Sequence, residues 1–179
     1  MDANYYKGIP NIYFTSIISN IIKIGNLGKD NKIILDFGCG IKILSKKLPQ
    51  KKIINYDINS NYTEHEDYKK LYFDIVVFNQ VLMYMDKKEI VSTFENIKKI
   101  NKNCEFIIGI TKENLISKLA ALASLNFIAH KGTRSTPKEQ IEIIKNQTKI
   151  LDVKNPKKSI KFLNSFVRAS NVTGKPNPL

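Results

Sequence analysis

Four short runs of apolar, often β-branched residues recur along this chain, separated by segments of different character. The runs cover residues 32–37, 52–57, 73–79 and 104–110. Their length and continuous hydrophobicity are typical of strands that are buried on both faces of a parallel sheet. Strands that alternate with helices build layered α/β domains. We therefore expect a mostly parallel sheet between two layers of helices.

The segments between these runs carry helical spacing and helix-start signals. We expect helices at about 11–25, at 41–48, and beginning after Asp86, Thr111 and Thr136. Two late segments, 149–153 and 160–168, alternate like strands, and the turn residues Asn155 and Pro156 stand between them. They predict an antiparallel pair at one edge of the sheet, followed by a loose tail after about residue 170.

The length of 179 residues suits a single domain spanning 1–179. Two cysteines make no disulfide framework, and the N-terminal residues lack the pattern of a secretory signal. No apolar run is long enough for a membrane helix. We therefore expect a cytoplasmic protein without a membrane partner.

The net charge of +13 raises the question of a nucleic-acid partner. Only Arg134 and Arg168 are arginines, and the lysines are scattered in pairs along the chain. Such pairs are more typical of solvated faces than of one binding groove. A nucleic-acid partner is thus possible but not favoured over a small molecule.

Polar and glycine residues mark the ends of three predicted strands. Residues 36–40 read Asp-Phe-Gly-Cys-Gly, Asp57 ends the next run, and Asn79, Gln80 and Val81 follow the third. Ligands of open α/β sheets bind outside the carboxyl ends of the strands. Glycines let the backbone approach such a ligand closely, and a carboxylate at Asp57 is placed to accept hydrogen bonds from a ribose diol.

Segments 35–40, 56–58 and 73–82 together resemble the class I S-adenosylmethionine-dependent methyltransferase family. The resemblance covers roughly residues 12–168. It implies a three-layer α/β/α sandwich with a Rossmann-like, mostly parallel sheet and a C-terminal antiparallel hairpin. Only 15 residues separate Asp57 from Phe73, so we expect the fold to be reduced between the second and fourth family strands.

The resemblance implies S-adenosylmethionine as cofactor, S-adenosylhomocysteine as product, and a set of cofactor-binding residues. Asp36 would contact the methionyl ammonium, Asp57 the ribose, and Ile58 the adenine. The full set is Asp36, Phe37, Gly38, Cys39, Gly40, Asp57, Ile58, Asp67, Tyr68, Asn79, Gln80 and Val81. Asp67, with Glu66 as the alternative, would bind the adenine amino group, and Tyr68 would stack on the base. Lys42 replaces the third glycine of the family motif.

Residues on the acceptor side are less well marked. Tyr84, His130 and Arg134 are candidates for substrate contacts, although a surface or core role remains open for each. No catalytic residue is assigned, because a sulfonium is already an activated methyl donor. A general base is needed only where the acceptor must lose a proton before the transfer. The cysteines and histidines form no spaced ligand set, so we expect no metal site.

The main hypothesis is a methyltransferase that uses S-adenosylmethionine and acts on a small molecule that the sequence does not identify. Two alternatives stay open. One is a cofactor-binding protein without transferase activity, and the other is an RNA-modifying methyltransferase. The sequence does not predict the oligomeric state.

Overall fold

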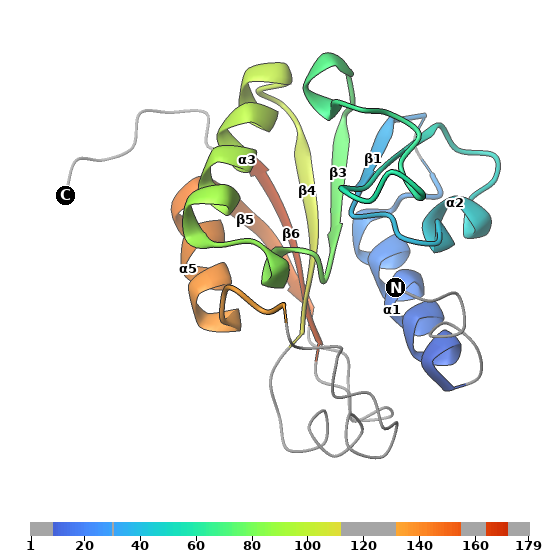
Figure 1. The fold of residues 1–179 in the computed structure, drawn as a ribbon, viewed down its shortest axis with the longest axis horizontal. Coiled ribbons are helices and arrows are strands. Elements are labelled where there is room, and N and C mark those ends of the chain that lie inside the picture. The colour runs from blue at the N-terminus through green and yellow to red at the C-terminus, as the bar shows by residue number, and fades with distance from the viewer. Residues whose placement is uncertain (1–8, 30, 112–131, 155–163, 172–179) are drawn as a thin grey trace.

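The computed structural model describes residues 9–29, 31–111, 132–154 and 164–171. Its centre is a six-stranded sheet with the order β2-β1-β3-β4-β6-β5 (Figure 1). The strands are β1 (Ile34–Phe37), β2 (Ile53–Tyr56), β3 (Ile75–Asn79), β4 (Glu105–Thr111), β5 (Thr148–Lys154) and β6 (Asn164–Asn171). The first four are parallel, and β6 lies antiparallel between β4 and β5. This confirms the mostly parallel sheet with its C-terminal hairpin.

Helices cover both faces of the sheet (Figure 1). On one face lie α1 (Ile9–Gly25) and α2 (Ile43–Lys47), and on the other lie α3 (Lys87–Ile100) and α5 (Pro137–Gln147). Capping boxes begin α3 at Asp86 and α5 at Thr136, as their sequences predict. The helix predicted after Thr111 lies outside the described residues.

The core consists of two apolar layers because consecutive residues of each strand point to opposite faces of the sheet. Val76 and Phe78 of β3 pack with α3 and α5, whereas Ile75 and Val77 pack with α1. Both sets are almost fully buried. The apolar runs in the sequence are therefore continuous because these strands are buried on both faces of the sheet.

The link between β2 and β3 is reduced, as expected. In place of a crossover helix and a further strand it contains only the 3-10 turn Tyr68–Lys70. As a result β2 is the edge strand on this side of the sheet. Most element boundaries differ from the predicted ones by one or two residues, and the largest described difference is that β6 runs to Asn171 instead of ending at 168. The tail after residue 171 lies outside the described residues.

Candidate functional site

The glycine-rich turn after β1 has a backbone conformation that glycine favours. Gly38 has φ 77° and Gly40 has φ 48°. The amides of Gly38 and Cys39 donate to the Tyr56 carbonyl at 2.8 and 3.1 Å, so the turn is joined to the end of β2. A Cβ atom on Gly38 would lie 2.6 Å from Cγ2 of Val81, so the turn also meets the segment after β3. The structure thus brings the three marked strand ends together.

Asp57 holds the glycine-rich turn in place. Its Oδ2 accepts a hydrogen bond from the Gly40 amide at 2.9 Å, and its Oδ1 accepts one from the Asn59 amide at 2.9 Å. A carboxylate oxygen has two lone pairs, so each oxygen retains one acceptor position. Asp57 is therefore a structural part of the turn and also keeps acceptors for a ligand hydroxyl.

Asp36 is a buried carboxylate without a positive partner among the described residues. It lies on β1 between Asn55 of β2 and Val77 of β3, and its exposed fraction is 3%. Burial raises its pKa to about 7, with a second contribution from the negative charge of Asp57. A cationic ligand group beside Asp36 would stabilise its ionised form.

The residues after β3 are the third part of the cluster. The Asn79 Oδ1 atom is buried and has no hydrogen-bond partner within the described chain. Gln80 follows in the left-handed region at φ 59°, and its amide donates to the Gly109 carbonyl at 3.0 Å. Gly109 lacks a side chain next to Asn79, and a Cβ there would lie 3.4 Å from Oδ1. The strand end is thus bent and polar, as the sequence indicates.

Lys42 adopts a left-handed backbone conformation, which glycine favours. Its φ of 60° is left-handed, and it begins α2. Its ammonium pairs with Glu64 at 2.8 Å, and Glu64 also accepts from Asn55 Nδ2 at 3.0 Å. These bonds lower the pKa of Glu64. Glu64 therefore connects the reduced link to Lys42, next to the glycine-rich turn. The sequence analysis did not predict this role.

The predicted adenine contacts fall in different surroundings. Ile58 is 97% exposed beside Asp57, although it is a large apolar residue. Tyr68 is 5% exposed, and its ring packs against Phe37 and Tyr56 at centroid distances of 5.1 Å. Asp67 caps the turn Tyr68–Lys70 by accepting from the Lys69 amide at 3.0 Å. Ile58 therefore has far more surface available to a base than Tyr68 has.

Among the candidates for substrate contacts, Arg134 connects the segment before α5 to the start of α3. Its guanidinium pairs with Asp86 at 2.7 Å and with Glu89 at 2.8 Å, both at the start of α3. Its amide donates to the Met83 carbonyl at 2.7 Å, close to the partly exposed Tyr84. The arginine positions the segment before α5 on the segment after β3. His130 lies outside the described residues.

The thiols in the described residues are buried and protonated. Burial raises the pKa of Cys39 and of Cys104 to about 12, which excludes a thiolate nucleophile at neutral pH. In the described part of the chain, no group of three His, Cys, Asp or Glu side chains is arranged for a metal ion. None of the helices described is long and apolar enough to span a membrane.

No protein-family model and no curated relative matches the sequence. Solved structures do match the fold at low identity. The N-methyltransferase NodS from Bradyrhizobium japonicum WM9 gives a TM-score of 0.62 at 16% identity, covering 90% of this chain and 97% of that one. The Burkholderia thailandensis 1,6-didemethyltoxoflavin-N1-methyltransferase gives 0.65 at 12% identity, covering 94% and 84%.

A further match is the magnesium protoporphyrin IX methyltransferase ChlM from Synechocystis PCC 6803 with bound S-adenosylhomocysteine. Its TM-score is 0.60 at 17% identity, and the alignment covers 89% of this chain and 82% of that one. The strand order and the antiparallel β6 agree with this likeness. The chain therefore has the fold of the class I S-adenosylmethionine-dependent methyltransferases.

Proposed function

We propose that this protein binds S-adenosylmethionine and transfers its methyl group to a small-molecule acceptor. The observation that carries the proposal is the buried Asp36 carboxylate, which has no positive partner among the described residues and lies next to a turn with two left-handed glycines. Two proteins of the same fold support it: ChlM and the 1,6-didemethyltoxoflavin-N1-methyltransferase were both solved with S-adenosylhomocysteine bound, and the second also holds 1,6-didemethyltoxoflavin.

The residues present fit the cofactor in chemistry. The Asp36 carboxylate suits the methionyl ammonium, since a buried negative charge is stabilised by a positive partner. The free acceptor positions on Asp57 suit the two ribose hydroxyls. Ile58 presents an exposed apolar surface for the adenine beside Asp57. The backbone of the turn Gly38–Gly40 would allow the cofactor a close approach, because glycines carry no Cβ atom.

The chain's own contribution to methyl transfer is binding and orientation. When bound, the cofactor supplies an activated methyl group on a sulfonium. Asn79, Gln80 and Val81 at the end of β3 would contact the cofactor, and Tyr84 beyond them would contact the acceptor. These groups align an acceptor and exclude water, which supplies a large part of the rate of a displacement.

The experiment that tests the proposal is calorimetric titration with S-adenosylmethionine and, separately, with S-adenosylhomocysteine. We expect both to bind in the micromolar range. Transfer of labelled methyl from S-adenosylmethionine to a panel of small amines, phenols and carboxylic acids then tests for turnover. No binding of either compound to the folded protein contradicts the proposal, and binding without transfer to any acceptor favours a non-enzymatic role.

Substitution of Asp57 tests the ribose contact. We expect Asp57→Ala to weaken S-adenosylhomocysteine binding at least about tenfold, because hydrogen bonds to a charged group are lost. Glu142→Ala, which removes an exposed carboxylate of α5, is the control and leaves the affinity unchanged. Titration calorimetry at a temperature well below the unfolding of both variants gives the comparison. Equal affinity of Asp57→Ala and the parent protein would remove Asp57 from the site.

A further inference from the structure

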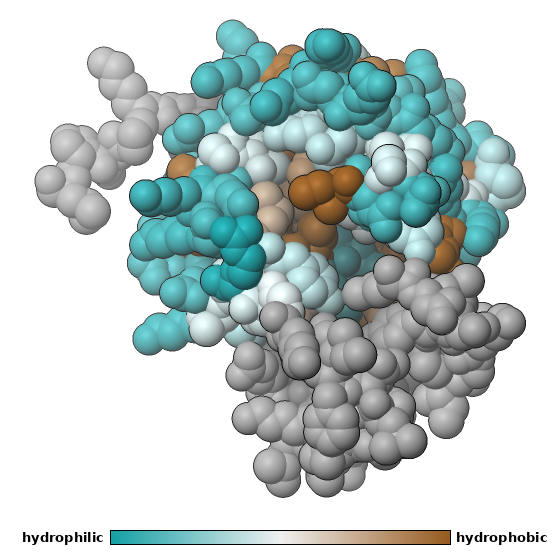
Figure 2. Space-filling model, in the orientation of Figure 1, coloured by the Kyte–Doolittle hydropathy of each residue, from teal (hydrophilic) through white to brown (hydrophobic). Residues whose placement is uncertain are grey.

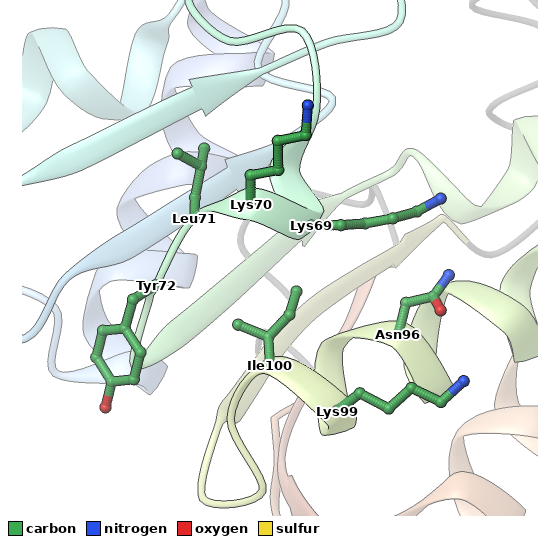
Figure 3. Close-up of a pocket in the computed structure, with 7 residues that line it drawn as sticks. All are labelled: Lys69, Lys70, Leu71, Tyr72, Asn96, Lys99 and Ile100. Atoms are coloured by element: carbon green, nitrogen blue, oxygen red, sulfur yellow. The ribbon is translucent and has the colours of Figure 1, made fainter.

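A hollow of about 470 Å³ lies away from the glycine-rich turn, between the reduced link and the last turn of α3 (Figure 3). Lys69, Lys70, Leu71 and Tyr72 line it from the link. Asn96, Lys99 and Ile100 line it from α3. The link residues precede the amino end of β3 and the α3 residues precede the amino end of β4, whereas the cluster described above lies at the carboxyl ends of β1, β2 and β3. The hollow is therefore a second, separate feature of the fold.

The reduced link accounts for this hollow. Between β2 and β3 the chain passes as a loop whose 3-10 turn packs on α3, in the place where a crossover helix would otherwise lie. On the face of the molecule seen in Figure 2, apolar residues are visible near the centre and hydrophilic residues cover most of the surroundings. The hollow is a shallow depression that is open to solvent, not an enclosed cavity.

The charges around the hollow are positive. In the part of the chain that the structure describes, none of Lys69, Lys70 and Lys99 pairs with a carboxylate. The ammonium groups of Lys69 and Lys99 extend toward the same side, where the Asn96 amide also lies (Figure 3). Several N–H donors around one point are what a phosphate group needs.

The rest of the lining is apolar and aromatic. Ile100 lies between the lysines and Tyr72, whose side chain is 58% exposed (Figure 3). The Tyr72 hydroxyl donates to Asp74 Oδ1 at 3.2 Å, so the ring is held at the edge of the hollow with a surface open to solvent. Exposed aromatic rings bind nucleobases by stacking in a way that tolerates any base.

We propose that this hollow binds a nucleoside phosphate, with the phosphate at Lys69 and Lys99 and the base against Tyr72. The nucleoside phosphate comes either from a free nucleotide or from a single-stranded RNA. The site is independent of the cofactor site, so its occupation does not require the methyl-transfer reaction.

The test uses uridine monophosphate, hexauridylate and inorganic phosphate as probes, with the full chain saturated with S-adenosylhomocysteine. Uridine keeps the probe distinct from the adenosine part of the cofactor. We expect Lys69→Gln/Lys99→Gln to weaken uridine monophosphate binding at least about tenfold, since two charged contacts are lost. The matched control Lys138→Gln/Lys145→Gln removes two exposed lysines of α5 and changes the affinity less than twofold.

Substitution of Tyr72 tests the base. Tyr72→Leu is expected to weaken uridine monophosphate binding several-fold while leaving the affinity for inorganic phosphate unchanged. Comparable affinity for the monophosphate and for hexauridylate identifies a free nucleotide as the ligand, and a large preference for hexauridylate identifies RNA.

Three results would overturn the proposal. The first is an absence of binding by both uridine probes at low salt. The second is equal weakening by the α5 control, or equal affinity for polyglutamate, which would assign binding to the overall charge. The third is binding of uridine monophosphate to the free protein that is lost when the chain is saturated with S-adenosylhomocysteine, which would place the probe in the cofactor cluster.

Discussion

Gly38→Ala is expected to lower the free energy of unfolding by about 2–4 kcal/mol, the combined effect of a left-handed backbone and an overpacked contact. At φ 77° any side chain is strained. The new Cβ would also lie 2.6 Å from Val81 Cγ2 and 2.9 Å from Val81 Cβ, so the clash involves a stiff, branched side chain. Thermal unfolding should occur about 5–15 °C lower for a chain of this size.

Cofactor binding should fall together with stability, because Val81 and the turn can separate only by moving the strand ends. The control is Gly28→Ala, where no atom lies within 4 Å of the added Cβ, and its melting temperature should change little. In the double variant Gly38→Ala/Val81→Ala the closest methyl contact is absent. Its loss of stability should therefore be smaller than the sum of the two single losses. Additive losses, or a stable Gly38→Ala with full affinity, would contradict the close contact.

Several features of the fold follow from local sequence alone. The β3 run is predictable because residues 75–78 are apolar without interruption, and only a strand buried on both faces uses such a pattern over so short a length. The starts of α3 and α5 are equally clear, since Asp86 with Glu89 and Thr136 with Glu139 each satisfy two helix-end amides.

The convergence of Gly38, Asp57 and Asn79 is predictable for a different reason. The carboxyl ends of neighbouring parallel strands share one edge of a sheet, so residues that follow them meet without any knowledge of loop structure. The roles of these residues toward the cofactor remain predictions that the binding experiments test.

Long-range partners of side chains were not predictable. Arg134 pairs with Asp86 and Glu89, which are more than 40 positions away in the sequence. Glu64 and Lys42 meet only because the reduced link folds back over the turn, and the sequence carries no periodicity there. Tyr68 likewise gives no pattern that separates a buried ring from an exposed one. In each case the path of a loop decides the contact.

Asp36→Asn is expected to raise stability and to weaken cofactor binding in the same molecule. The folded pKa of Asp36 is about 7, above its ordinary value of 3.8, so the folded protein binds the proton more tightly than the unfolded chain. Stability is therefore lost as the pH rises from about 4 to about 7, and the loss persists above pH 7. Asparagine does not titrate and avoids this loss.

The stability gain of the variant over the parent protein should grow by roughly 1.4 kcal/mol per pH unit between pH 4 and pH 7 and then level off. Urea unfolding at pH 5 and pH 8 measures this growth, with Glu142→Gln, an exposed charge removal, as the control. A stability gain that is the same at both pH values would show that ionisation of the Asp36 carboxyl does not destabilise the folded protein.

The opposite effect on binding separates function from folding. If Asp36 holds the methionyl ammonium, S-adenosylhomocysteine should raise the melting temperature of the parent protein more than that of Asp36→Asn, and the affinity of the variant should be at least about tenfold lower at pH 8. Binding to the parent protein should also tighten as Asp36 ionises toward pH 7. A variant that is more stable than the parent protein and binds S-adenosylhomocysteine equally well would support the buried carboxylate but exclude the ammonium contact. A cation bound by Asp36 must be bound more weakly once the negative charge is removed.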